Sequence, residues 1–95
     1  MAFQQLADTV TISASTTTAT TTTGGSVTPG KGVVARVVNA GTTVAFFAFA
    51  GTATSAGVAI AGGEAVTLAW PGGEDVAVIL ASGTGNVYVT VGQEV

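Results

Sequence analysis

The chain has 95 residues, enough for one domain, and only 7% of them are charged, with a net charge of −3 at pH 7. A surface that follows a phosphate backbone needs several basic residues, and this chain has 2, so nucleic acid is excluded as its natural partner. No apolar run is long enough to span a bilayer and the first residues lack the basic start of a signal peptide, so we expect no membrane partner.

The predicted core is thin. Apolar residues make up 47% of the chain, but most of them are alanine and valine. There is no cysteine for a disulfide and no histidine for a structural zinc site. Small domains with few large core residues often depend on association, so we expect this chain to bind copies of itself or another protein.

The first predicted strand covers residues 9–13, where polar and apolar residues alternate. A charge-free, threonine-dominated segment follows, and β-branched threonine favours extended backbone. We predict an extended arm over residues 1–31, with one or two strands, that pairs with a sheet edge of its own chain or of a neighbour. A low-complexity linker and an ice-binding or glycan-binding face are the alternatives. The threonines assigned to an interface are Thr16, Thr17, Thr18, Thr20, Thr21, Thr22 and Thr23.

Glycines divide residues 32–95 at short intervals, and the runs between them are rich in valine, threonine, isoleucine and phenylalanine, as is typical of strands. The predicted strands are residues 33–38, 43–50, 64–70, 75–81 and 86–91. Residues 39–41 and 82–85 are predicted to be hairpin turns. The whole pattern predicts an all-β fold, a small jelly-roll-like β-sandwich over residues 32–95, with an immunoglobulin-like topology as the alternative.

Four residues of these strands are further interface candidates. The strand over residues 43–50 is apolar on both faces, so we expect one face to pack in the core and the other against a second sheet or a neighbour, and we assign Phe47 and Phe49 to the interface. Arg36 is the one charge in an apolar strand. It is expected to pair with a carboxylate such as Glu64, to reach across an interface, or to point outward at a sheet edge. Trp70 is either a core residue or an interface anchor.

No constellation of residues predicts catalysis. A nucleophile needs a neighbouring base, and without histidine the candidates are Lys31, in a turn, and the carboxylates. Glu74 and Asp75 are adjacent at the start of a strand, where neighbouring side chains point to opposite faces. We therefore predict a protein that is not an enzyme and that has no cofactor and no metal site.

Residues 33–93 resemble small virion proteins of tailed bacteriophages. The resemblance is carried by RVVNAGTTVAFFAFAGTATSAG and GGEAVTLAWPGGEDVAVILASGTGNVYVTVGQEV, in which a strand ending in R-V-x-N-x-G leads into an aromatic strand and the chain ends in NVYVTVG. It implies a head decoration (cement) protein, with a β-sandwich or jelly-roll fold, that binds the major capsid protein. It also implies a homotrimer or other homo-oligomer on the outer surface of the capsid of a virion, made in the cytoplasm of a host bacterium.

Two functional hypotheses follow. In the first, the chain is a structural virion protein that stabilises the head by binding across coat-protein subunits. In the second, it is a binding module of a tail, neck or fibre that recognises a carbohydrate or a receptor. Such a module needs exposed aromatic residues with convergent polar groups, and the candidates are Trp70 and Tyr88.

Overall fold

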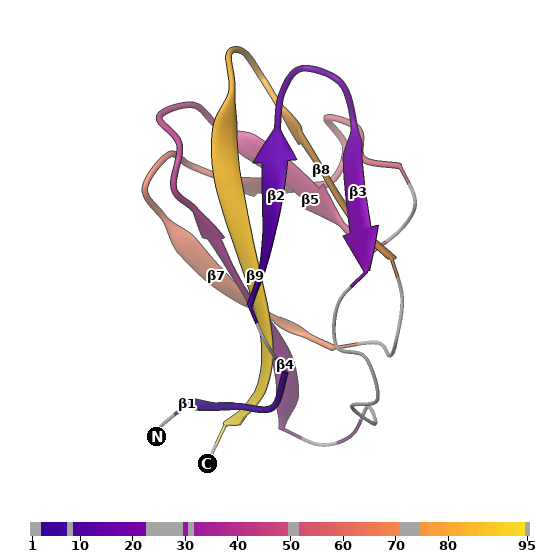
Figure 1. Cartoon of the computed structure of the whole chain (residues 1–95), viewed down its shortest axis with the longest axis vertical. Coiled ribbons are helices and arrows are strands. Elements are labelled where there is room, and N and C mark those ends of the chain that lie inside the picture. Colours follow the sequence, from indigo (N-terminus) through magenta and orange to yellow (C-terminus); the bar gives the residue numbers. More distant parts are fainter. Residues whose placement is uncertain are drawn as a thin grey trace.

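The computed structural model describes residues 3–7, 9–22, 30, 32–49, 52–70 and 75–94. Within these ranges the chain contains no helix and forms nine strands, as the all-β prediction expects (Figure 1). Their bounds are β1 Phe3–Gln5, β2 Val10–Ala14, β3 Ala19–Thr22, β4 Val33–Asn39, β5 Ala45–Ala48, β6 Val58–Ile60, β7 Ala65–Ala69, β8 Asp75–Leu80 and β9 Gly85–Glu94.

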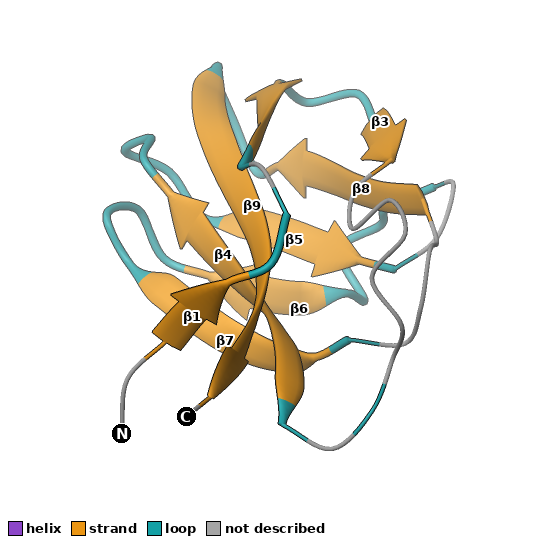
Figure 2. Cartoon of the chain, turned by 60° about the horizontal axis from the view of Figure 1, so that its bottom comes forward, coloured by secondary structure: helices purple, strands orange, loops and turns teal. Residues whose placement is uncertain are grey.

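The strands form two sheets that lie in two layers (Figure 2). Sheet A has the order β1-β9-β4-β7. β2 pairs with an earlier part of β9, on the same side of β9 as β1. Sheet B has the order β3-β8-β5-β6, and every strand pair in both sheets is antiparallel. The two described ends of the chain both lie at the lower end of sheet A, because β1 pairs with the last residues of β9 (Figure 1).

Both predicted hairpins are wrong. β4 belongs to sheet A and β5 to sheet B, so the turn at residues 40–44 crosses between the layers. β8 and β9 are likewise in different sheets, and the turn at residues 81–84 makes a second crossing. Turn residues mark where a chain reverses, but they do not say whether the next strand pairs with the previous one or enters the facing sheet.

The core fills the space between the inner faces of the two sheets. Along β9, Val87, Val89 and Val91 are fully buried, and the residues between them point outward. The rest of the buried apolar cluster comes from both layers and consists of Ile12, Ala14, Ala35, Val37, Ala45, Phe47, Ile60, Trp70, Val76, Val78 and Leu80. Most of these side chains are small, which confirms the thin core expected from composition.

The N-terminal residues are part of both layers. β2 pairs along β9, and Ile12 and Ala14 lie in the core. β3 pairs with β8 at the edge of sheet B. Of the two partners that we expected for the threonine segment, the structure therefore shows its own sheet edge for Ala19–Thr22. The expected bounds differ in two further places, since the short strands β1 and β6 were not predicted from the sequence.

Candidate binding face

The outer face of sheet A is polar and hollowed. The register of β2 and β9 places Thr11 opposite Tyr88 and Ser13 opposite Asn86 on this face. β4 adds Arg36, between Thr67 of β7 and Thr90 of β9. Outward residues of three adjacent strands thus place hydroxyl, amide and guanidinium groups on one surface, on which Val38 of β4 lies opposite Tyr88.

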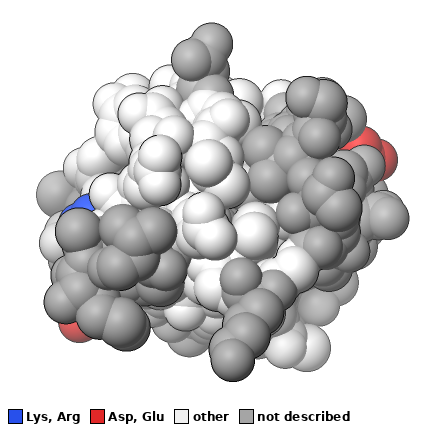
Figure 3. Space-filling model, turned by 90° about the horizontal axis from the view of Figure 1, so that it is seen from below, with Lys and Arg blue, Asp and Glu red and all other residues white. Residues whose placement is uncertain are grey.

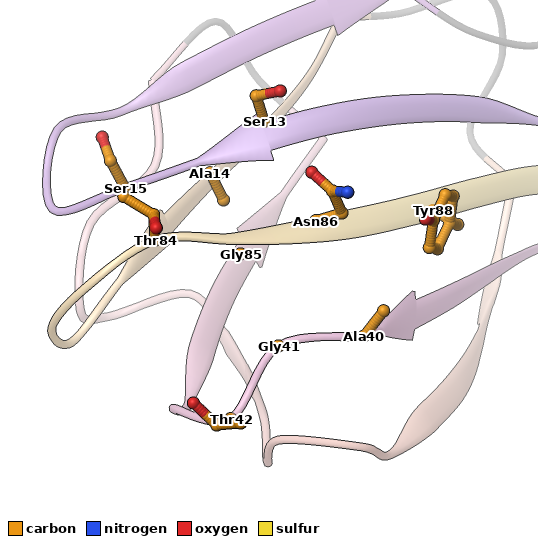
Figure 4. Close-up of a pocket in the computed structure, with 10 residues that line it drawn as sticks. All are labelled: Ser13, Ala14, Ser15, Ala40, Gly41, Thr42, Thr84, Gly85, Asn86 and Tyr88. Carbon is orange, nitrogen blue, oxygen red and sulfur yellow. The ribbon is translucent and has the colours of Figure 1, made fainter.

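The upper hollow is an open depression of about 720 Å³ where β2 and β9 meet the turn that follows β4 (Figure 4). Its lining residues are Ser13, Ala14, Ser15, Ala40, Gly41, Thr42, Thr84, Gly85, Asn86 and Tyr88. A Cβ atom on Gly85 would lie 3.1 Å from the Cα of Gly41, so the two backbones meet closely here. This glycine contact keeps the hollow open between the polar side chains.

A buried amide fixes the turn that borders this hollow. Asn39 is fully buried, and its Nδ2 donates hydrogen bonds to the carbonyl oxygens of Thr43 (2.8 Å) and Ile60 (2.9 Å). Its Oδ1 accepts a hydrogen bond from the N–H of Gly41 (3.0 Å). Ala40 N–H donates to the carbonyl of Asn86 at 3.0 Å, which ties the turn to β9. These hydrogen bonds therefore fix the turn that borders the hollow.

The polar side chains of the upper hollow are available for binding. Within the described part of the chain, Ser13, Thr42, Thr84 and Asn86 make no side-chain hydrogen bond. Ser15 differs, because its hydroxyl contacts Thr17. None of the described residues that line the hollow is charged. The arrangement suits a neutral ligand that both donates and accepts hydrogen bonds.

Tyr88 borders a second hollow of about 470 Å³ on the same face. This lower hollow is lined by Phe3, Gln5, Thr9, Arg36, Val38, Tyr88 and Thr90. The hydroxyls of Thr9 and Thr90 are 2.6 Å apart and share a hydrogen bond across the strands. Tyr88 lines both hollows, so an elongated ligand can occupy the two hollows at once.

Arg36 has no ion-pair partner among the described residues, so the expected pair with Glu64 is wrong. The register explains this result, because Arg36 lies opposite Thr67, whereas the Glu64 carbonyl accepts a hydrogen bond from Asn39 N–H at the far end of β4. The alternating burial of β4 points Arg36 outward. β4 is a central strand of sheet A, so Arg36 is not an edge residue.

The outer face of sheet B is apolar by comparison. Phe46 and Ala48 of β5 and Ile79 of β8 are half-buried there, and Ala59 of β6 is exposed opposite Phe46. Among the described residues, Asp75 at the start of β8 is the only charged one on this face. Figure 3 shows the lower end of the molecule, where the described surface carries charged atoms only at its margins.

Three predicted interface residues belong to the chain's own core. Phe47 is fully buried and Trp70 is 4% exposed, while Phe49 is half-buried against the same cluster. Their rings stack edge to face, with centroids 5.1 Å apart for Phe47 and Phe49 and 5.9 Å apart for Phe49 and Trp70. The assignment of Phe47 and Trp70 to an interface is therefore wrong. The strand over residues 45–48 presents its other face outward, and Phe46 takes the place that we gave to Phe47.

The threonine segment is divided between a turn and a strand. Thr16, Thr17 and Thr18 are exposed between β2 and β3, and Thr18 Oγ1 accepts a hydrogen bond from Ala53 N–H at 2.9 Å. In β3, Thr20 is exposed and Thr21 is half-buried. Thr22 ends the strand, and Thr23 lies outside the described residues. Their role at an interface stays a prediction.

Sequence analysis singled out Tyr88 but not the residues that surround it. Thr84 lies in one of the two turns that we predicted to be hairpins, Thr42 follows the other, and Asn86 lies at the start of β9. The sequence does carry one signal for this site, because both turns are polar and both join predicted strands at the same end of the fold. That signal can be interpreted only when it is known that the two turns lie side by side.

The described residues contain no group of three or more side chains suited to hold a metal ion. No helix that could cross a membrane occurs in the described part of the chain. Comparison of the chain with protein families, with curated proteins and with solved structures gives no match.

Proposed function

We propose that this chain is a non-enzymatic structural virion protein, a decoration (cement) protein on the outer capsid surface of a tailed bacteriophage. In this role it binds the major capsid protein across the boundary between neighbouring subunits and associates with further copies of itself, as a trimer or another homo-oligomer. A protein that binds assembled coat subunits but not separate ones stabilises the assembled state by mass action.

The strand order supports a jelly roll as the finer description of the fold. Strands β2, β9, β4 and β7 lie side by side in one sheet and β3, β8, β5 and β6 in the other, all antiparallel. From β2 onward, successive strands alternate between the sheets except at β5 and β6, as they do when a long hairpin is rolled into two layers. Jelly rolls are common in viral capsid and lectin domains. This support rests on the similarity of the fold to such domains, and not on a shared binding site.

The observation that carries the proposal is the apolar outer face of sheet B. Phe46, Ala48 and Ile79 lie together on it and are half-buried, and Ala59 is exposed beside Phe46. Contiguous apolar surface on a soluble protein marks a protein contact more often than a solvent-facing region. With so little charge on this face, its partner must be another largely apolar protein surface, for which we propose the coat subunit.

A matched pair of variants tests this attachment. Ala59→Lys places a charge on the outer face of sheet B, and Ala65→Lys does the same on the outer face of sheet A, in each case at an exposed alanine of an edge strand. We expect Ala59→Lys to be lost from purified particles and Ala65→Lys to be incorporated like the parent chain. Equal incorporation of both variants contradicts attachment through sheet B, and absence of the parent chain from virions contradicts the virion role altogether.

The polar outer face of sheet A favours a second candidate, a recognition module of a tail, neck or fibre. Tyr88 supplies an aromatic surface between two hollows, which is the arrangement that such a module needs. Copy number separates the two candidates. A number comparable with that of the coat protein supports decoration of the whole lattice, whereas a few copies per particle support the recognition module.

A further inference from the structure

The geometry points to a binding site for an acidic oligosaccharide on the outer face of sheet A, with a neutral sugar in the upper hollow, Tyr88 at the centre and a sugar carboxylate at Arg36. The site does not depend on where in a particle the chain is placed, because the residues that form it belong to one chain and one face.

The upper hollow has the chemistry of a sugar site. Ser13, Thr42 and Thr84 offer hydroxyls, and Asn86 offers an amide, so each group can donate and accept a hydrogen bond. None of them has a protein partner among the described residues. Among the described residues that line this hollow, the apolar side chains besides the Tyr88 ring are two alanines. A peptide side chain would find almost no apolar contact there, whereas a ring with several hydroxyls can satisfy these groups.

Tyr88 supplies the apolar part of the site. Its ring is half-buried between the two hollows, and its hydroxyl makes no hydrogen bond to a described residue. Figure 4 shows Tyr88 beyond Asn86 on β9, with Ser13 on the adjacent strand. Tyrosine has an apolar body and a polar tip, which matches a sugar ring with a C–H face and a rim of hydroxyls.

The lower hollow sets the charge preference. Arg36 is exposed there, and among the described residues it has no carboxylate partner and no acidic residue lines that hollow. A guanidinium group presents a planar fork of donors that fits a carboxylate. Gln5 donates its Nε2 hydrogen to the carbonyl of Ala7 at 2.8 Å, which leaves its side-chain oxygen as an acceptor for a sugar hydroxyl. A uronic acid next to a neutral sugar satisfies both hollows.

The direct test measures binding of the full chain to an array of microbial and plant oligosaccharides that carries each acidic fragment beside its carboxyl-reduced counterpart. We expect binding to fragments in which uronic acids and neutral sugars alternate, and binding about tenfold weaker after reduction, since an exposed charge-assisted contact contributes roughly 1–2 kcal/mol. We also expect that preference to decrease with added salt. Failure to bind any acidic fragment, or equal binding of the reduced fragments, overturns the inference.

Variants then assign the two hollows, with the best-bound fragment as the probe. Tyr88→Ala is expected to weaken binding at least about tenfold and Asn86→Ala about threefold to tenfold. Phe46→Ala, which removes a half-buried aromatic ring from the other outer face, is the matched control and should bind like the parent chain. Because Tyr88→Ala can disturb the sheet, Tyr88→Phe is measured beside it, and both are checked for an unchanged thermal unfolding transition. Equal losses in Tyr88→Ala and Phe46→Ala contradict the site.

Arg36→Gln separates charge recognition from general binding. It should remove the preference for the acidic fragment and leave binding of the carboxyl-reduced fragment unchanged. A loss of both to the same extent overturns the assignment of the carboxylate to Arg36. None of these outcomes bears on particle incorporation, so the sugar site and the capsid proposal fail or stand separately.

Discussion

The outer faces of the two sheets are built from similar short strands, yet their chemistry is opposite. On sheet A the outward positions of β2 and β9 carry serine, threonine, asparagine and tyrosine. On sheet B the outward positions of β5 and β8 carry Phe46, Ala48 and Ile79, together with exposed Asp75 and fully buried Ala77. The inner faces are alike, because both contribute small apolar residues to one core. Packing in the core thus determines the residue type at every second position of a strand. The residue types at the remaining positions reflect what each outer face contacts.

The largest expected effect compares two neighbours on β5. Phe47 is fully buried in the core, and Phe46 is half-buried on the outer face of sheet B. We expect Phe47→Ala to lower the free energy of unfolding by about 3–5 kcal/mol, because it leaves a cavity in a thin core. Phe46→Ala should cost about 1–2 kcal/mol, since only part of its surface is shielded from water. Denaturant unfolding of both variants measures the difference, and equal costs would show that both rings lie in protein contacts.

The second effect concerns the turn that shapes the upper hollow. Asn39→Ala leaves the carbonyls of Thr43 and Ile60 and the N–H of Gly41 without their partner, inside the fold. We expect a loss of about 2–4 kcal/mol in unfolding free energy and of any ligand binding at sheet A.

The control for Asn39→Ala is Asn86→Ala, where the amide is exposed and makes no side-chain hydrogen bond to a described residue. It should unfold like the parent chain. A similar loss of stability at the two asparagines would mean that Asn86 supports the fold and is not held ready for a ligand.

A third, smaller effect is expected at Gly62, which packs against the same turn. A Cβ atom on Gly62 would lie 2.7 Å from the backbone carbon of Thr42, whereas one on Gly30 would meet nothing within 4 Å. Gly62→Ala should therefore cost about 1–3 kcal/mol, because backbone must move to admit the methyl group. Gly30→Ala should leave stability almost unchanged. Thermal unfolding of the pair tests whether Gly62 is needed for close approach or only for flexibility.

The smallest effect is expected at Arg36. Since it has no ion-pair partner among the described residues, Arg36→Gln should unfold like the parent chain at about 0.01 M and at about 1 M salt. If Arg36→Gln is instead less stable than the parent chain at low salt but not at high salt, Arg36 belongs to a stabilising charge pair. Glu64→Gln would then identify the acidic member of that pair.

The sequence predicted elements better than it predicted their arrangement. Alternation located β4, β7 and β9 within a few residues, and it placed Val66, Leu68 and Trp70 on one face of β7, which is the inner face. It did not reveal which face of β5 is internal, because that strand is apolar on both sides. The inward choice of Phe47 follows from its partners in β6 and β8, and pairing is a property of the whole sheet.

The candidate site was predicted only in part, for the same reason. Tyr88 was recognised as an aromatic residue with a polar group, but its neighbours come from β2, from β9 and from a turn between β4 and β5. These segments are far apart in the sequence and meet only because β9 lies between β2 and β4. β6 was missed because its three residues lie among glycines, where neither length nor alternation gives a signal.

The position of β9 has a consequence for how the chain reaches its native state. β9 is among the last residues of the chain, yet it is the strand to which β1, β2 and β4 all pair. Sheet A therefore cannot assemble until residues 85–94 have left the ribosome, and the ordering of the early strands must wait for them. Folds dominated by such distant pairings fold slowly. During that interval apolar strands such as β5 and β8 are without their partners, so yield should depend on chaperone capacity more than on final stability.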